Sequence, residues 1–251
     1  MPTASKGLTK SQCNRIGKFL RLFTGLELAL KARLHLPVND RTGVGAMINN
    51  FEARNAYWAG SANHLRLLAD IRNVLTHQLG TAGGYPVAVT SHAVEVLREI
   101  RRHLQKPEPV SHRHCRPVLT VSSDHSLGAV LAMAIDNGFS QFPVVADGRF
   151  GGLVTENEII RWLGRRAKAN SVEVNLSSIT VKTLLKEKDP FLRGIQIFHF
   201  ERLDSPVEEV MSRFSMEPAL EVILLTQSGS KHTPLEGIVT QWDAARYPAQ
   251  E

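Results

Sequence analysis

The chain has 251 residues, 43% of them hydrophobic, with 30 Lys and Arg against 24 Asp and Glu and only two cysteines. This length predicts two domains or one large one, and the ordinary shares of apolar and charged residues exclude wholesale disorder. No 18 apolar residues run together and the N-terminus lacks the apolar stretch of a signal peptide, so we expect no membrane span and a cytoplasmic location. The widely separated Cys13 and Cys115 cannot build a disulfide framework, which agrees with that location.

The first hundred residues predict four helices. The first has an apolar stripe with helical periodicity, formed by Ile16, Phe19, Phe23, Leu26 and Leu30. Pro37 and the stretch 39–45 should end it, and further helices are expected around 47–51 and 65–75, before the glycine-rich break at 80–84. Ser91 is the predicted cap of a fourth helix, whose inward residues would be Ala93, Val96, Leu97, Ile100 and Leu104. We therefore expect an all-α four-helix bundle over residues 1–106.

The texture of the sequence changes at Gln105. Residues 107–116 are rich in proline and polar residues, as linkers are. Beyond them, six β-branched runs alternate with short helical patterns, so this half should be α/β and the whole chain an α+β multidomain protein. The predicted strands are Pro117–Val121, Phe142–Val145, Gly152–Thr155, Ile195–Phe200, Glu221–Thr226 and Gly237–Thr240.

The second half also repeats itself. The segment Asp124–Leu127 leads into an amphipathic helix, and so does Asp204–Val207 eighty residues later. The run Gly152–Thr155 recurs as Gly237–Thr240, offset by 85 residues. Two copies at this spacing indicate a duplicated domain rather than a solenoid, which we place at residues 117–170 and 171–251.

The net charge of +6 is unevenly distributed. Residues 1–106 hold 15 Lys and Arg against 6 Asp and Glu, a net charge of +9, whereas residues 107–251 hold 15 against 18, a net charge of −3. A basic surface favours anionic partners such as nucleic acid. RNA is therefore a candidate partner of the helical domain.

A short pattern at the end of each copy suits a nucleotide. Thr155 and Thr240 each end a predicted strand, and an acid follows three residues later, Glu158 in the first copy and Asp243 in the second. The threonine hydroxyl can cap the next helix, and the carboxylate can accept hydrogen bonds from ribose hydroxyls. Free N–H groups at the helix start can face a phosphate.

These residues resemble the CBS domain, and the two copies in tandem resemble the paired CBS, or Bateman, module. The first copy matches in Gly138–Val145 and Gly152–Thr155, and the second mainly in Gly237–Asp243. The resemblance implies a pseudo-twofold pair whose clefts hold an adenine-containing ligand such as AMP, ADP, ATP or S-adenosylmethionine. It also implies that the ribose is gripped by Thr155 with Glu158 and by Thr240 with Asp243.

The copies depart from the CBS pattern in two places. Glu158 stands where the family has aspartate, and residues 216–220 of the second copy lack the Gly-x-Ser-x-x-Pro-Val signature. The alternative interpretation is a dimerisation platform in which Thr155 and Thr240 are plain helix caps.

The third predicted helix ends in Arg72-Asn73-Val74-Leu75-Thr76-His77. Metal-independent RNA cleavage needs a base, an acid and a cation for the phosphorane, and histidine and arginine can supply them. On a straight helix, Asn73 and His77 share a face, while Arg72 and His77 lie about 140° apart. One histidine cannot easily serve as both base and acid, so two chains related by a twofold axis would have to supply the pair.

The Arg-x4-His spacing on a bundle helix resembles the HEPN superfamily. This resemblance implies a dimeric four-helix bundle and, in active members, a metal-independent endoribonuclease that leaves a 2′,3′-cyclic phosphate. Arg72 and His77 would then be catalytic and Asn73 would position them. The alternative is that Arg72 and His77 are solvated residues near a helix C-terminus, where the helix dipole favours cations.

These observations predict a homodimeric, adenine-nucleotide-sensing protein whose ligand gates RNA cleavage or binding by the helical domain. The rival interpretation is a non-enzymatic regulator that binds an adenine nucleotide or S-adenosylmethionine and signals to a protein partner through the bundle. We expect no metal site, because the His112-x-His114-Cys115 spacing matches no structural zinc pattern.

Overall fold

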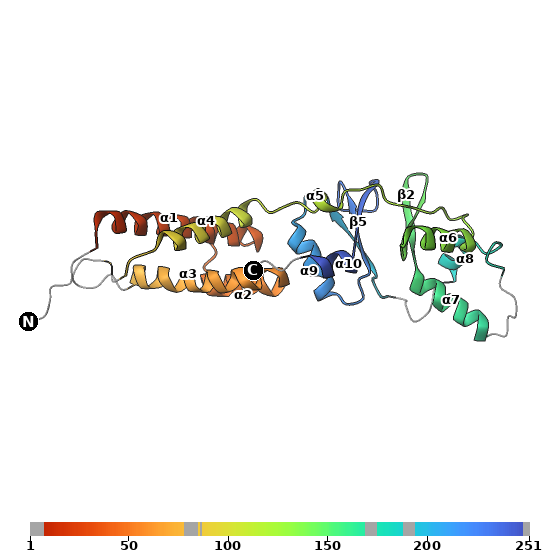
Figure 1. Cartoon of the computed structure of the whole chain (residues 1–251), viewed down its shortest axis with the longest axis horizontal. Helices are drawn as coiled ribbons and strands as arrows, with labels where there is room; N and C mark the ends of the chain where they lie inside the picture. The colour runs from red at the N-terminus through yellow and green to blue at the C-terminus, as the bar shows by residue number, and fades with distance from the viewer. Residues whose placement is uncertain (1–7, 78–84, 86, 169–174, 188–193, 248–251) are drawn as a thin grey trace, which may run out of the picture. The chain divides into compact units, whose positions relative to one another are not determined.

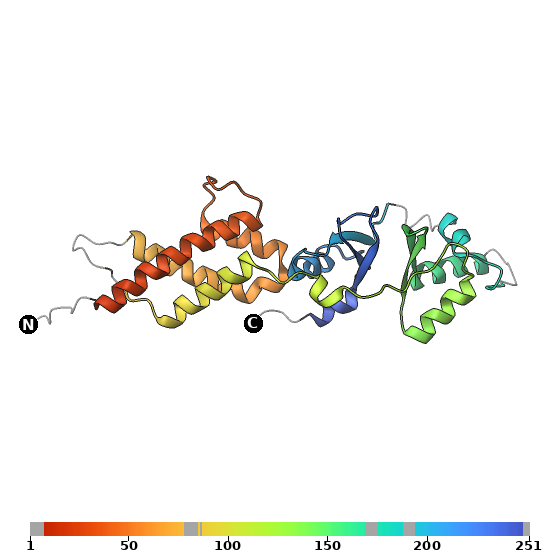
Figure 2. The ribbon, with the colours of Figure 1, turned by 90° about the horizontal axis from the view of Figure 1, so that it is seen from above.

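The computed structural model in Figures 1 and 2 describes residues 8–77, 85, 87–168, 175–187 and 194–247. Two compact units are present. The first holds the N-terminal helices up to Glu108, together with Pro206–Ser212 and Tyr247, and the second holds Pro109–Ser205 and Arg213–Arg246. The mixed α+β architecture with a helical N-terminal region is confirmed.

The first unit is helical. Its elements are α1 (Lys10–Arg33), α2 (Val44–Arg54), the 3-10 turn η1 (Ala56–Trp58), α3 (Ala59–His77) and α4 (Ser91–Gln105). The Thr9 side chain caps α1 and exchanges hydrogen bonds with Gln12 in a capping box. The predicted stripe of α1 is buried throughout, and it joins residues of α2, α3 and α4 in one apolar core. Figure 2 shows α4 running beside α1, with which it makes extensive contact.

The N-cap of α4 is Thr90 rather than the predicted Ser91. Its hydroxyl accepts a hydrogen bond from the Ala93 amide at 3.1 Å, and its backbone is extended, as an N-cap requires. The inward face differs accordingly: Val94 is buried, whereas Ala93 and Val96 are half-buried. The predicted break at 80–84 lies outside the described residues.

The second unit contains the two repeats. The first repeat has α6 (Leu127–Asn137), β1 (Gln141–Ala146), β2 (Arg149–Thr155) and α7 (Glu156–Lys168), preceded by the one-turn α5 (Ser111–His114). Helix α8 (Val181–Lys186) lies within residues 171–251 in sequence but packs into the apolar core of the first repeat. The second repeat has β3 (Phe198–Arg202), β4 (Val222–Thr226), β5 (Leu235–Thr240) and α10 (Gln241–Arg246). Helix α9 (Val207–Met216) belongs to the second repeat in sequence, but its residues are divided between the two units.

Each repeat is built on an antiparallel strand pair, β1 with β2 and β4 with β5. In the second repeat, β3 adds a parallel strand beside β4. The repeats pack together through a shared apolar cluster that includes Leu153 of the first and Ile197, Val222 and Leu224 of the second. Phe150 stands edge-on to the rings of Phe198 and Phe200, with 5.1 Å between ring centroids in each pair.

The predicted strand Pro117–Val121 is not a strand. Val121 alone forms a bridge, to Val144, with hydrogen bonds of 3.0 and 2.9 Å to the backbone of β1. Pro117 has no N–H to give to a ladder. The predicted strand Ile195–Phe200 does form, but it begins three residues later than expected, at Phe198.

The segment expected to act as a linker is packed against the second repeat. Val110 is fully buried, and its amide donates to the Ser205 carbonyl at 2.8 Å. Cys115 bridges to Gly237 of β5. A side chain at Gly237 would overlap the His114 carbonyl oxygen, so glycine is required for this close approach.

Within the described part of the chain, no helix combines the length and apolarity needed to cross a bilayer.

The helical core makes a clear prediction. Leu65→Ala should lower the free energy of unfolding by about 2–5 kcal/mol, because Leu65 is buried among the helices and truncation leaves a cavity. Leu67→Ala, on the exposed side of the same helix, is the matched control and should change stability by about 0.5 kcal/mol or less. Urea unfolding followed by circular dichroism measures both. Equal losses in the two variants would contradict the observed packing of α3.

Gly237→Ala should destabilise the second unit by about 1–3 kcal/mol, because the new methyl group meets the His114 backbone. Gly151→Ala is a control on β2, since a methyl there would make only an ordinary contact at 3.7 Å with the Val144 carbonyl. Thermal unfolding of both variants tests the contact. A Gly237→Ala protein as stable as the Gly151→Ala protein would show that the segment before Arg116 does not pack against β5.

Candidate functional site

The two strand pairs place equivalent residues at the clefts. Gln141 pairs with Thr155 in the first repeat, and Val222 pairs with Thr240 in the second. The residues just before β1 and β4, Ser140 and Glu221, therefore occupy equivalent positions beside the starts of α7 and α10. Two cavities of the second unit lie at these positions, and each is lined by residues of both repeats.

The first cavity, which we name the Asp243 cleft, has a volume of about 520 Å³. The second repeat contributes residues around the start of α10, and the first contributes residues before and within its own strand pair. Its lining includes Arg116, Phe139, Thr240, Trp242, Asp243 and Arg246.

Thr240 and Asp243 lie together in this cleft. The Thr240 hydroxyl donates to Asp243 Oδ2 at 2.7 Å, the Thr240 amide donates to the same oxygen at 2.8 Å, and the Asp243 amide donates to the Thr240 hydroxyl at 3.4 Å. These bonds form a reciprocal cap at the start of α10. The other carboxylate oxygen, Oδ1, lies 3.9 Å from His114 Nδ1. The cap thus holds a carboxylate at the cleft wall.

Two arginines and two aromatic rings complete the Asp243 cleft. Arg116 and Arg246 supply positive charge, and Arg116 is oriented by a 3.1 Å hydrogen bond to the Arg113 carbonyl. The Phe139 and Trp242 side chains are 51% and 70% exposed, so both offer ring surface to a ligand. A carboxylate, guanidinium groups and exposed rings are the groups that bind a ribose, a phosphate and a base.

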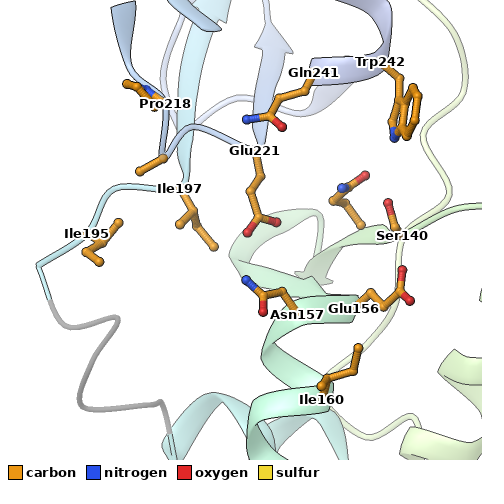
Figure 3. Close-up of a pocket in the computed structure, with 12 residues that line it drawn as sticks. Ser140, Glu156, Asn157, Ile160, Ile195, Ile197, Pro218, Glu221, Gln241 and Trp242 are labelled. Carbon is orange, nitrogen blue, oxygen red and sulfur yellow. The ribbon is translucent and has the colours of Figure 1, made fainter.

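The second cavity, which we name the Glu221 cleft, has a volume of about 500 Å³ and is drawn in Figure 3. Glu156, Asn157 and Ile160 come from the first repeat, whereas Ile195, Ile197, Pro218 and Glu221 come from the second. Figure 3 shows Glu221 reaching from the start of its strand toward Asn157, with Gln241 and Trp242 above. Ser140, Gln141 and Trp242 line both this cleft and the Asp243 cleft.

Glu221 is held by the first repeat. The side chains of Thr155 and Asn157 donate hydrogen bonds to its carboxylate, and its amide donates to the Ile197 carbonyl at 2.7 Å. Burial raises the pKa of Glu221 above its ordinary value, and the two side-chain hydrogen bonds oppose that effect. Glu221 was not among the predicted site residues, although it stands in the second copy at the position that Ser140 occupies in the first.

Thr155 and Glu158 do not line the Glu221 cleft among its described residues. Thr155 is buried and its hydroxyl accepts a 3.2 Å hydrogen bond from the Glu158 amide, as a helix cap does. The residues that follow Thr155 face the cavity instead, namely Glu156 and Asn157. The two repeats thus present different residues of the strand–helix turn to their clefts.

The helical unit has a polar cavity of about 440 Å³ that includes Arg72 and Asn73. Arg72 donates to Asn73 Oδ1 at 3.2 Å, lies 3.6 Å from Glu27 and stacks over the Phe23 ring at 5.9 Å. Lys31 and Arg41 add positive charge to the same cavity. His77 is exposed at the end of α3 and is not among the lining residues, so within one chain the structure joins Arg72 to Asn73 but not to His77.

The chain is similar to known proteins in its second half. The family model of the CBS domain matches residues 110–165. The search of curated proteins found no match. The residues that the family model matches include α6, β1, β2 and most of α7.

Three solved structures illustrate the likeness. The CBS domain pair of protein MJ0100, in complex with 5′-methylthioadenosine and S-adenosyl-L-methionine, is 18% identical, covers 56% of this chain and 94% of its own, and has a TM-score of 0.41. The CBS domain of a membrane protein from Sphaerobacter thermophilus is 19% identical, with 63% and 99% coverage and a TM-score of 0.42. A CBS domain protein of unknown function from Thermoplasma acidophilum is 18% identical, with 57% and 71% coverage and a TM-score of 0.42.

The likeness to the CBS domain is carried by residues 110–165, which its family model matches.

Proposed function

We propose that this chain is a regulatory protein that senses an adenine-containing ligand through two CBS repeats, residues 117–170 and 171–251, and that the ligand controls the helical domain, residues 1–106. One observation carries the proposal: the Asp243 cleft combines a carboxylate, two arginines and two exposed rings in one cavity. The CBS match over residues 110–165 supports it.

In this proposal different residues of the Asp243 cleft bind the ribose, the phosphate and the adenine of the ligand. Asp243 accepts hydrogen bonds from the ribose hydroxyls, and its reciprocal cap with Thr240 holds it in place. Arg116 and Arg246 bind the phosphate of AMP, ADP or ATP. The adenine stacks on Phe139 or Trp242, whose rings are exposed to the cavity.

A second ligand site follows from the pseudo-symmetry of the repeats. We assign Thr155 and Glu158 to it as supports of the strand–helix turn, since Thr155 caps α7 and its side chain bonds to Glu221. S-adenosylmethionine remains a candidate ligand beside the nucleotides.

Helix α9 offers a physical route from ligand to helical domain. Its first turns belong to the first unit, where Glu209 accepts hydrogen bonds of 3.0 and 2.7 Å from Arg33. The chain leaves its last turn directly into Pro218–Glu221 of the Glu221 cleft. A ligand that shifts this segment would act on the same helix, and homodimerisation would supply the two-state interface that such regulation requires.

For the helical domain we propose a HEPN-like, metal-independent endoribonuclease acting on RNA. The cavity with Arg72 and Asn73 supports it, because Lys31 and Arg41 lie beside Arg72 and could bind phosphate. Each chain carries His77 one turn further along α3, so the acid and base would come from two chains. If RNA is not cleaved, the bundle is instead the surface through which a non-enzymatic regulator signals to a protein partner.

Nucleotide binding is tested by Arg116→Gln. The variant should bind AMP about tenfold more weakly, because it loses one charged hydrogen bond to the phosphate, worth about 1.5 kcal/mol. Calorimetry of the full chain measures the change. Arg149→Gln, an exposed position on β2 outside both clefts, is the charge-matched control and should bind AMP as the unchanged protein does. An Arg116→Gln protein with unchanged AMP affinity would remove the phosphate assignment.

Ribonuclease activity is tested with a labelled RNA in EDTA. His77→Ala and Arg72→Lys should each lower the cleavage rate at least about a hundredfold, because a general acid–base group or the phosphorane cation is lost or misplaced. His64→Ala, another exposed histidine of α3, is the control and should leave the rate unchanged. Equal rates in all the variants, or no cleavage by any protein with or without ATP or AMP, would exclude the nuclease.

A further inference from the structure

The helical unit carries a basic surface on the face where α1 and α4 lie side by side (Figure 2). We name it the α1–α4 basic strip, and it consists of Lys18, Arg21, Arg98 and Arg101. None of the four is among the described residues that line the polar cavity around Arg72. We propose that the strip binds the phosphate backbone of RNA. This inference rests on the proposed action of the helical domain on RNA, and it adds a surface outside the cavity that holds the RNA.

Two contacts show that α1 and α4 run in parallel. Arg15 Nη1 donates to the Val89 carbonyl, shortly before α4 begins, at 3.1 Å. Further along α1, Gly25 lies beneath the guanidinium of Arg101, because a Cβ at Gly25 would stand 3.1 Å from Arg101 Nε. Glycine is unfavourable inside a helix relative to alanine. Here the missing side chain leaves room for Arg101 to lie against α1.

The cations of α1 fall into two groups. Arg15, Lys31 and Arg33 each donate a hydrogen bond to a backbone carbonyl, so they help to hold the helical unit together. Lys18 and Arg21 are exposed, and neither forms a hydrogen bond or an ion pair within the part of the chain that the structure describes. These two side chains are therefore available to a partner.

Few acids offset the charge of the strip. Helix α1 contains one acid, Glu27, which lines the polar cavity and lies 3.6 Å from Arg72. On α4, Glu99 pairs with Arg102 at 3.5 Å. Glu95 is the remaining acid of α4, and it sets one negative charge against the four cations of the strip. The strip therefore keeps a net positive charge.

The cations of the strip also repel one another. Residues three apart on a helix are neighbours, so Lys18 repels Arg21, and Arg98 repels Arg101. Because Arg101 lies over Gly25 and the helices are parallel, Arg98 stands close to the level of Arg21 on the adjacent helix. A polyanion relieves this repulsion, and the release of its own counterions favours binding.

The side chains around the strip favour RNA over a membrane or a protein partner. The neighbouring positions on α1 are small or polar, namely Asn14, Gly17 and Thr24. In α1 and α4, whose residues are all described, Leu28 is the one large apolar side chain that is exposed. Membrane-surface helices insert an apolar face, and protein interfaces centre on apolar or aromatic anchors. Arginine, by contrast, matches phosphate with a planar fork of donors.

The test is RNA binding by the full chain as a function of salt. The probe is a labelled oligouridylate with methylated 2′-hydroxyls, which cannot be cleaved by attack of a 2′-hydroxyl. In Arg21→Gln/Arg98→Gln, the slope of log affinity against log salt should become shallower by about 1.4, at about 0.7 for each lost phosphate contact of a single strand. Fluorescence anisotropy between about 50 and 200 mM salt measures the slope.

The charge-matched control is Arg54→Gln/Arg149→Gln, at exposed positions of α2 and β2, and it should keep the slope of the unchanged protein. Both double variants replace exposed side chains, so their thermal unfolding midpoints should equal that of the unchanged protein. A shallower slope in the strip variant at an unchanged midpoint would thus report a lost contact with RNA and not a folding defect.

The outcomes separate the strip from the proposed nuclease. If the slope falls only in the strip variant but the unchanged protein cleaves no unmodified RNA, the nuclease is excluded and the strip stands. If RNA is cleaved but the strip variant keeps the slope of the unchanged protein, the inference is wrong and the nuclease stands. The inference is also overturned if the unchanged protein does not bind the probe. The same holds if the strip variant loses binding only to vesicles of phosphatidylserine and phosphatidylcholine.

Discussion

The antiparallel register of the two strand pairs is the constraint on which the candidate sites depend. By pairing Gln141 with Thr155 and Val222 with Thr240, each hairpin brings the residue before its first strand beside the start of the helix that follows its second. Because side chains alternate between the faces of a strand, a shift of one residue would turn these groups away from the cavities. The shared apolar cluster around Leu153 and Ile197 then joins the repeats, so that each cleft draws on both.

The two repeats have the same antiparallel strand pairing, so the clefts differ mainly in which side chains stand at equivalent positions. Ser140 and Glu221 are equivalent in register, yet one is a neutral hydroxyl and the other a carboxylate bonded by Thr155 and Asn157. The packing of the segment before Arg116 against β5, which needs the bare backbone of Gly237, brings an arginine to the Asp243 cleft. The two cavities thus differ in the charged side chains that line them, with Glu156 and Glu221 in one and Arg116, Asp243 and Arg246 in the other.

In the helical unit, an apolar core is combined with a cluster of charged side chains around Arg72. Its apolar core orders α1 to α4, and its polar cavity combines Lys31, Arg41 and Arg72 with the acids Glu27 and Asp40. Arg72 is tied to Glu27, Asn73 and the Phe23 ring, which leaves it oriented but also partly neutralised. His77 stands apart from this cluster within one chain, so any chemistry that needs both residues depends on how two chains meet.

Much of the secondary structure could be read from periodicity and breakers, because both are local properties of the chain. The stripe of α1, the turn from Thr155 into α7 and the turn from Thr240 into α10 are examples, and the same local signals placed the duplication. The sequence could not exclude a strand at Pro117–Val121, because strand formation depends on a partner ladder that is distant in the chain. Nor could it show that Glu156, Asn157 and Glu221 line one cavity, since these residues are brought together only when the repeats pack. The sequence by itself determined the apolar stripe of α1 and the two turns from a strand-ending threonine into a helix, because these are local patterns. Only the tertiary structure decided which charges each cleft contains, because that depends on contacts between residues far apart in the chain.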